Sequence, residues 1–162
     1  MLTITPPLLE KLAQQPALVD RVREKVAIIS WGGTHMDADT LQIYRTEIFP
    51  EITIQGGYGS TMALGGSLER IGHASDDLCV FDPFAPYVTY SVANSHTGTA
   101  VSYGERGQVI MNHVSKAIFV PNNLERDTAI RVSGLPGQPG DSVADVLPVQ
   151  TFQGTEVTEG VY

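Results

Sequence analysis

The chain has 162 residues and a formal net charge of −8; 42% of its residues are hydrophobic and 17% are charged. This composition is typical of a folded soluble protein rather than a disordered chain. The acidic balance excludes a general nucleic-acid binder, which gains affinity by releasing counterions from phosphates. The sequence has neither an apolar stretch near the roughly 20 residues of a membrane span nor a basic and then apolar leader, so we expect a cytoplasmic protein with no membrane partner.

The first part of the chain alternates helical and strand patterns. Apolar residues recur at helical spacing over residues 6–15 and again over residues 16–26, and each segment begins with proline. The run VAIISW at residues 26–31 is β-rich and is interrupted by only one polar residue, so it predicts a strand that is buried on both faces. A glycine turn at Gly32 and Gly33 ends this strand.

A second strand and a second glycine segment follow. Helical spacing over residues 37–49, with Asp37 or Asp39 as the N-cap, predicts a helix between the two strands. EITIQ at residues 51–55 predicts the second strand, which a single helical crossover makes parallel to the first. The glycine-rich segment IQGGYGSTMALGG at residues 54–66 then predicts a flexible loop with few large side chains. Both glycine segments lie at carboxyl strand ends, where open α/β sheets bind ligands.

After about residue 75 the pattern becomes β-rich. Short β-branched and aromatic runs are separated by turn residues, and SYGERGQV predicts a hairpin turn at Glu105 and Arg106. SGLPGQPGDS at residues 133–142 predicts a loop. We therefore expect an α/β fold, with a partial parallel sheet and helices over residues 1–75. A small antiparallel, barrel-like β subdomain follows over residues 76–162.

The glycine-rich segment is a candidate phosphate site. Backbone N–H groups and hydroxyls could be offered by Gly57, Gly59, Ser60 and Thr61. The segment matches neither GxxxxGK[ST] nor GxGxxG, so a purely structural turn remains the alternative. Asp127, in the charged segment LERDTAIRV, could grip a diol such as a ribose or simply face solvent on a strand.

The sequence pattern around the histidines, Ser95 and the cysteine favours structural roles for them over catalytic ones. No metal-ligand spacing relates the four histidines, which are His35, His73, His96 and His113. Ser95 and His96 are adjacent in sequence, which does not make a nucleophile–base pair. The single cysteine, Cys79, lies in an apolar run and is expected to be a small buried hydrophobe.

Three segments together resemble the acyl- and aryl-adenylate-forming ligases. Residues 26–64 resemble the stretch from the adenine-binding glycine turn of that superfamily to its YGxTE motif. YGERGQVIMNHVS resembles the later GExGExxxT hairpin, and LERDTAIRV resembles the YRTRDLTRV segment of the phenylacetate–CoA ligase branch. Within that branch, the phenazine-biosynthesis adenylating proteins are the most similar. The three motifs occur in the family's order over residues 26–132.

The resemblance implies a nucleotide site. It implies that Gly32, Gly33 and Thr34 border the adenine, that Tyr58 lies against the base, and that Thr61 reaches the α-phosphate as the catalytic residue. It also implies that Gly56 and Gly57 flank the carboxylate substrate and that Asp127 holds the ribose hydroxyls. Gly57, Gly59 and Ser60 of the glycine segment are further expected nucleotide contacts. The family places a glutamate Mg²⁺ ligand where this chain has Met62, a poor partner for a hard cation, so we expect no metal ligand there.

The resemblance thus implies a portion of an ATP-dependent ligase that activates a carboxylic acid, and an aromatic acid of secondary metabolism by likeness to the branch. Its expected cofactor is ATP or AMP. Its expected partners are the acid, coenzyme A or a carrier protein as acceptor, and a complementary or second copy of the chain. The family's Ser/Thr/Gly-rich phosphate loop and its C-terminal lysine are not found in the sequence. A non-catalytic nucleotide-binding or accessory module is therefore the alternative, and a plain β-rich interaction module is a third.

Overall fold

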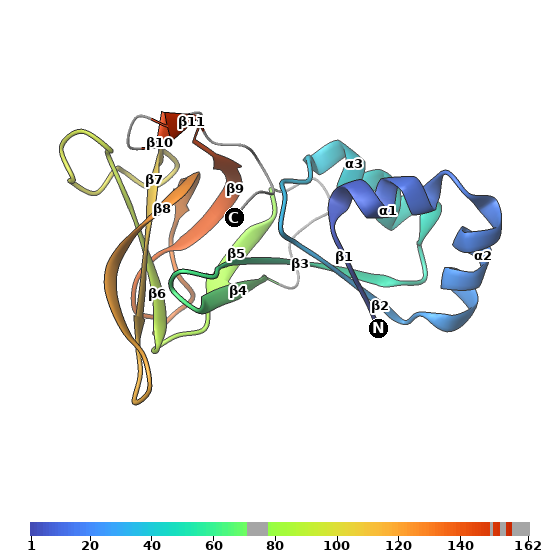
Figure 1. Cartoon of the computed structure of the whole chain (residues 1–162), viewed down its shortest axis with the longest axis horizontal. Coiled ribbons are helices and arrows are strands. Elements are labelled where there is room, and N and C mark those ends of the chain that lie inside the picture. Colours follow the sequence, from blue (N-terminus) through green and yellow to red (C-terminus); the bar gives the residue numbers. More distant parts are fainter. Residues whose placement is uncertain (71–77, 150, 153–154, 157–162) are drawn as a thin grey trace.

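The computed structural model describes residues 1–70, 78–149, 151–152 and 155–156. The predicted subdomain boundary and His73 lie outside these residues. The helices are α1 (Pro6–Ala13), α2 (Pro16–Lys25) and α3 (Ala38–Ile43), and a π-helical turn η1 (Tyr44–Ile48) continues α3. Nine strands form one sheet in the order β1-β2-β3-β4-β5-β9-β8-β7-β6 (Figure 1).

The strands are β1 (Leu2–Ile4), β2 (Ile28–Trp31), β3 (Thr53–Ser60), β4 (Gly65–Glu69), β5 (Val80–Pro83), β6 (Val88–Ala93), β7 (Arg106–Val114), β8 (Phe119–Val132) and β9 (Ser142–Pro148). Two further strands, β10 (Thr151–Phe152) and β11 (Thr155–Glu156), pair only with each other. None of the helices in the described residues is both long and apolar enough to cross a membrane.

β2 and β3 run parallel, as the crossover pattern predicts, and β1, a strand that the sequence analysis did not predict, is parallel to β2. β1 pairs with β2, and β2 pairs with the first half of β3, with Trp31 opposite Gly56. The prediction that the first strand is buried on both faces is wrong. Ile29 and Trp31 are buried, but Ile28 is 39% exposed. Because successive side chains point to opposite faces, only the face shared with Leu9 of α1 joins the core.

The predicted helices form close to their expected positions. Proline occupies the first position of both α1 and α2, where its missing N–H costs nothing. Of the two candidate caps for the third helix, Asp37 is the N-cap, and its carboxylate accepts a hydrogen bond from the Thr40 N–H at 2.8 Å. This bond lowers the pKa of Asp37 below its ordinary value.

The predicted glycine loop is for the most part a strand. β3 runs through the glycines to Ser60, and its second half pairs antiparallel with β4, with Gly59 opposite Gly66. A Cβ atom on Gly59 would lie 2.8 Å from the carbonyl oxygen of Gly65, so glycine allows the two backbones to approach this closely. The glycine-rich segment therefore packs against a neighbouring strand, and the turn is confined to residues 61–64.

The rest of the sheet is antiparallel and strongly curved, as Figure 1 shows, which confirms the expected α/β class with a barrel-like β-rich part. The sheet does not close: β1 and β6 are its edge strands in the described residues, and an isolated bridge joins Tyr90 of β6 to Asp141. The hairpin turn is not at Glu105 and Arg106, because β7 already begins at Arg106, and the backbone turns at residues 102–105. The predicted loop after residue 132 is confirmed up to β9.

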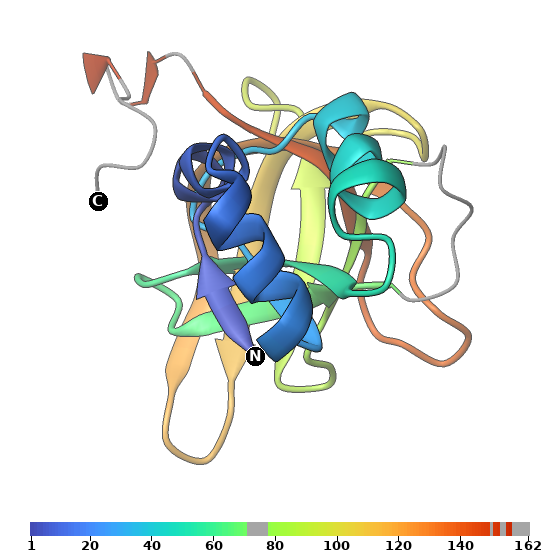
Figure 2. The same ribbon diagram turned by 90° about the vertical axis from the view of Figure 1, so that its right-hand side faces the viewer.

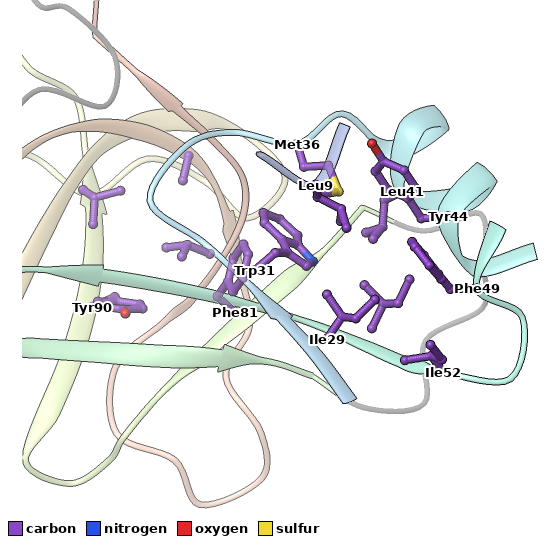
Figure 3. Packing of buried hydrophobic residues seen from close by; sticks show 14 of the residues in the cluster. Leu9, Ile29, Trp31, Met36, Leu41, Tyr44, Phe49, Ile52, Phe81 and Tyr90 are labelled. Atoms are coloured by element: carbon purple, nitrogen blue, oxygen red, sulfur yellow. The ribbon is translucent and has the colours of Figure 1, made fainter. Parts of the chain in front are cut away.

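One apolar cluster joins the helical and β-rich parts. Figure 2 shows the helices in front of the curved strands, and Figure 3 shows the side chains between them. The Trp31 ring of β2 meets the Phe81 ring of β5 edge-on at 6.3 Å between centroids. A partly buried ion pair also joins the two parts, since a guanidinium nitrogen of Arg45 in η1 lies 2.7 Å from a carboxylate oxygen of Glu69 in β4. Cys79 is half-buried, and burial raises the pKa of its thiol, as expected for a packing residue.

Candidate functional site

Two close contacts bring the first glycine turn, the glycine strand and the charged segment together. The backbone at Gly32, just after β2, lies against β3: a Cβ atom on Gly32 would be 2.7 Å from the carbonyl oxygen of Gly57. The next residue of β3, Tyr58, donates a hydrogen bond from its hydroxyl to Oδ2 of Asp127 on β8, at 3.0 Å. The first glycine turn, the glycine strand and the charged segment are therefore neighbours in space.

Tyr58 stands in an aromatic group. Its ring lies 6.0 Å from that of Phe81 and 5.8 Å from that of Tyr90. Burial, and then the negative charge of Asp127, raise the pKa of Tyr58 well above its ordinary value. The phenol therefore stays protonated and acts as a donor to the carboxylate, which leaves Asp127 able to accept further hydrogen bonds from a diol.

Glu125 is a site residue that the sequence reasoning missed. It is only 8% exposed, and it lies two residues before Asp127 on β8, in the stretch where the pairing of β8 with β7 shifts register. Burial raises the pKa of its carboxyl, while hydrogen bonding with Ser60 and Asn123 opposes the rise. The sequence shows Glu125 and Asp127 two residues apart, but the register shift between Leu124 and Thr128 breaks the regular alternation of faces, so the spacing alone does not say which side chain is buried.

Ser60 and Thr61 lie where β3 ends and the chain turns. Ser60 is half-buried, and its Oγ accepts a hydrogen bond from the Ala63 N–H at 3.4 Å. Thr61 is exposed, as is the next residue, Met62, at 73%. The turn is thus anchored by Ser60 and Ala63, and it presents Thr61 at the surface.

The first glycine turn is held against β9. Gly33 has a positive φ of 87°, a conformation that favours glycine, and Nδ1 of His35 lies 3.0 Å from the carbonyl oxygen of Val146. That carbonyl accepts, so Nδ1 carries the proton. Between them, the hydroxyl oxygen of Thr34 is buried and has no hydrogen-bond partner among the described residues. A buried hydroxyl of this kind is typical of a place where water or a ligand binds.

The glycines of β3 differ in the space around them. A Cβ atom on Gly56 would lie 2.8 Å from the Trp31 ring, and one on Gly59 would meet the hairpin backbone. The absence of a side chain at these two positions is thus explained by packing within the sheet. A Cβ atom on Gly57 would lie 3.7 Å from its nearest neighbour, an ordinary van der Waals contact, so packing within the sheet does not by itself require glycine at this position.

The remaining candidates do not join this site. Nδ1 of His113 lies 2.9 Å from the carbonyl oxygen of Ala63. Ser95 and His96 are 3.1 Å apart, but both are exposed in a loop. Among the residues that the structure describes, no group of three His, Cys, Asp or Glu side chains could hold a metal ion.

The comparisons with known proteins identify the fold. No family model and no curated protein matches the chain. Solved structures do match. One is an artificially fused adenylation–carrier protein di-domain, NpsA-ThdA from Klebsiella oxytoca, with 14% identity over 97% of this chain and 32% of that one, at a TM-score of 0.64. A 2-hydroxyisobutyryl-CoA ligase in complex with 2-HIB-AMP is 14% identical over 98% of this chain and 35% of its own, at a TM-score of 0.60. A benzoate CoA ligase from Burkholderia xenovorans is 22% identical over 88% of this chain and 30% of its own, at a TM-score of 0.61.

These neighbours are adenylate-forming ligases. The chain has the fold of a part of such a ligase and spans about a third of the length of these structures. The expected relation to adenylate-forming ligases is confirmed at the level of the fold.

Proposed function

We propose that the chain is a portion of an ATP-dependent ligase that activates a carboxylic acid as its adenylate. The observation that carries the proposal is the hydrogen bond from Tyr58 to Asp127, which joins two of the resembling segments beside the Gly32–Gly57 contact. A flat ring, a carboxylate and exposed backbone then lie within one small region. Adenine needs a flat partner, and a ribose diol needs an acceptor.

The proposed contacts follow from these positions. The base would lie against Tyr58 and the turn formed by Gly32, Gly33 and Thr34, where the unpartnered hydroxyl of Thr34 offers a hydrogen bond. Asp127 would accept from the ribose hydroxyls. Gly59, Ser60 and Thr61 would donate to the α-phosphate, with Thr61 as the catalytic residue. Gly57, where the sheet leaves enough space for a Cβ atom, would lie beside the acid.

The reaction would be a substitution at phosphorus. A carboxylate oxygen of the acid attacks the α-phosphorus of ATP; the new C–O–P bond forms as the bond to the leaving pyrophosphate breaks. No covalent bond to the protein is needed at this step. The protein's contribution would be positioning and stabilisation of the developing phosphoryl charge.

The finer assignments rest on the sequence resemblance. We propose the phenylacetate–CoA ligase branch, nearest the phenazine-biosynthesis adenylating proteins, with an aromatic acid as substrate and coenzyme A or a carrier protein as acceptor, in the cytoplasm. The benzoate CoA ligase and the adenylation–carrier protein fusion are neighbours whose printed names agree with such an acid and such an acceptor. A complementary chain or a second copy of this chain would supply the rest of the site.

A non-catalytic nucleotide-binding module is the second candidate. The observation that favours it is Met62, which is 73% exposed and stands where the resembling family has its Mg²⁺-binding glutamate. A thioether would not replace that ligand.

Two measurements on the 162-residue chain test these proposals. Calorimetric titration with AMP and ATP measures binding, and acid-dependent ATP–pyrophosphate exchange with benzoate or phenylacetate measures activation. We expect AMP binding without exchange. Exchange clearly above that of a Thr61→Ala variant would show that the chain alone is a catalyst. Absence of any nucleotide binding would reject both candidates in favour of a β-rich interaction module.

A further inference from the structure

Strand β9 contains a bulge beside the first glycine turn. The register shifts there, so that two residues of β9, Asp145 and Val146, lie opposite the single residue Ala129 of β8. Asp145 has a φ of +48°, a conformation that glycine usually supplies in a bulge of this kind. A residue with a side chain keeps such a conformation only where its surroundings hold it. The contacts around the bulge therefore show what fixes it.

Arg106, the first residue of β7, holds the first residue of the bulge. Its Nη1 donates to the backbone carbonyl oxygen of Asp145 at 2.8 Å, and its Nη2 forms an ion pair with the Asp145 carboxylate. The planar guanidinium can bind these two acceptors of one residue at the same time. Arg106 belongs to YGERGQVIMNHVS, the resembling segment that takes part in neither of the two close contacts described above.

The second residue of the bulge, Val146, contacts the first glycine turn. Its carbonyl oxygen accepts a hydrogen bond from Nδ1 of His35 at 3.0 Å, and its side chain packs against the apolar cluster. His35 directly follows residues 32–34, where the hydroxyl of Thr34 is buried without a hydrogen-bond partner among the described residues. A bulge removes backbone groups from the regular ladder, so their carbonyls need other donors. Here one carbonyl is bound by Arg106 and the next by His35.

We propose that Arg106 and His35 are positioning residues: Arg106 fixes the β9 bulge, and the bulge, through His35, holds the turn at residues 32–34. The inference rests on the proposed function, in which this turn borders the adenine. Neither side chain is assigned a contact with the nucleotide. Because the turn would meet the base and not the phosphate, loosening it should weaken the binding of AMP and of adenosine by the same factor.

Two substitutions of His35 in the full chain test the hydrogen bond to the bulge. His35→Ala removes the donor, whereas His35→Asn keeps an N–H close to the position of Nδ1. Amide hydrogen exchange of residues 32–35 reports how firmly the turn is held, and calorimetric dissociation constants for AMP and adenosine report the site. We expect His35→Ala to speed the exchange and to raise both constants by about three- to tenfold, the range for one lost hydrogen bond. His35→Asn should stay within about twofold of wild type, and an Asn variant that behaves like the Ala variant would overturn the assignment.

Two substitutions of Asp145 test the bulge itself. Glycine adopts a positive φ without strain and keeps the backbone carbonyl, so Asp145→Gly should leave the turn close to wild type although the ion pair is lost. Asp145→Val disfavours this φ and should reproduce the effects of His35→Ala. Arg106→Ala should speed amide exchange in the turn, and clearly less so in the Asp145→Gly background, where the bulge needs less support. Equal effects of Arg106→Ala in both backgrounds would reject its role in fixing the bulge.

Asn122→Val is the matched control for backbone strain. Asn122 also lies in a strand, β8, with a φ of +54°, but it is not part of the β9 bulge. Its replacement should destabilise the protein without changing amide exchange of residues 32–35 or nucleotide binding. Effects on the turn as large as those of Asp145→Val would mean that general destabilisation, not the bulge, loosens it. Circular dichroism checks that each variant is folded.

The amide exchange measurement separates this inference from the proposed function. If the wild-type chain binds neither AMP nor adenosine, the proposed function fails, and amide exchange of residues 32–35 still shows whether the bulge holds the turn. Unchanged exchange in His35→Ala and Asp145→Val would reject the positioning role even if nucleotide binds. A loss of affinity confined to AMP would also overturn it, because the phosphate and not the base would then depend on the turn.

Discussion

Tyr58 and Asp127 are 69 residues apart in sequence, and the Tyr58 hydroxyl donates to Oδ2 of Asp127 at 3.0 Å. The contact spans from the glycine strand β3 to the charged strand β8. Since burial and the carboxylate both raise the pKa of Tyr58, the phenol remains a donor over the physiological pH range. Any diol bound at Asp127 would share the carboxylate with Tyr58.

Asp127→Ala should weaken AMP binding by about 1.5–3 kcal/mol, the range for hydrogen bonds to a charged group. Tyr58→Ala should also raise the dissociation constant, because it removes the flat surface for the base. Calorimetric titration measures both. Asp20→Ala is a matched control, since the Asp20 side chain is 77% exposed on α2. Equal effects of Asp127→Ala and Asp20→Ala would contradict the ribose assignment.

Tyr58→Phe should lower the free energy of unfolding by about 1.5–3 kcal/mol, because the carboxylate of Asp127 loses its phenolic donor while the aromatic packing stays. Urea denaturation measures the loss. Tyr87→Phe provides the control, since Tyr87 is 59% exposed. A Tyr58→Phe variant as stable as wild type would mean that water replaces the hydroxyl at no cost.

Gly57→Ala and Gly59→Ala should differ in stability. The added Cβ atom would lie 3.7 Å from its nearest neighbour at Gly57, but only 2.8 Å from the carbonyl oxygen of Gly65 at Gly59. Gly59→Ala should therefore lower the free energy of unfolding by about 1–3 kcal/mol, and Gly57→Ala by much less. Thermal unfolding compares the two. Gly57→Val should in addition block the acid and nucleotide with little loss of fold. Normal binding by Gly57→Val would remove Gly57 from the site.

Asp37→Ala should destabilise the protein by about 1 kcal/mol at neutral pH through loss of the α3 cap, whereas Asp37→Asn should keep the cap. The folded-state pKa of Asp37 lies below its ordinary 3.8. Its charge therefore adds stability above pH 3.8, and this is lost as pH falls through the folded pKa. Urea unfolding from neutral pH to pH 3 should show a shallower acid loss for Asp37→Asn than for wild type.

Glu125 should have the opposite pH dependence. Burial raises its folded-state pKa above the ordinary 4.5, so the folded protein binds more protons than the unfolded chain just above that pH. Its contribution is complete below pH 4.5 and is lost as pH rises through the raised value. Wild type should lose stability over this interval relative to Glu125→Gln, as urea unfolding at a series of pH values would show. Parallel pH profiles would mean that Glu125 is solvated like an ordinary surface carboxylate.

The sequence by itself determined α1, α2, α3, β2 and the beginning of β3. Apolar spacing, with proline at the start of α1 and α2 and Asp37 before α3, specifies helices through interactions within a few residues. A helix between two apolar strands also determined that β2 and β3 are parallel, because the chain must cross over the sheet to begin the next strand.

Only the tertiary structure decided the conformation of the glycine segment and the composition of the site. Glycine has little local preference, so residues 56–60 became a strand only because β2 and β4 supply hydrogen-bond partners to its two halves. The sequence also did not show that the Glu125 side chain is buried. β8 shifts register against β7 between Leu124 and Thr128, so alternation along the sequence does not mark which side chains are inside; the curvature of the sheet, which brings β8 to face β3, decides it.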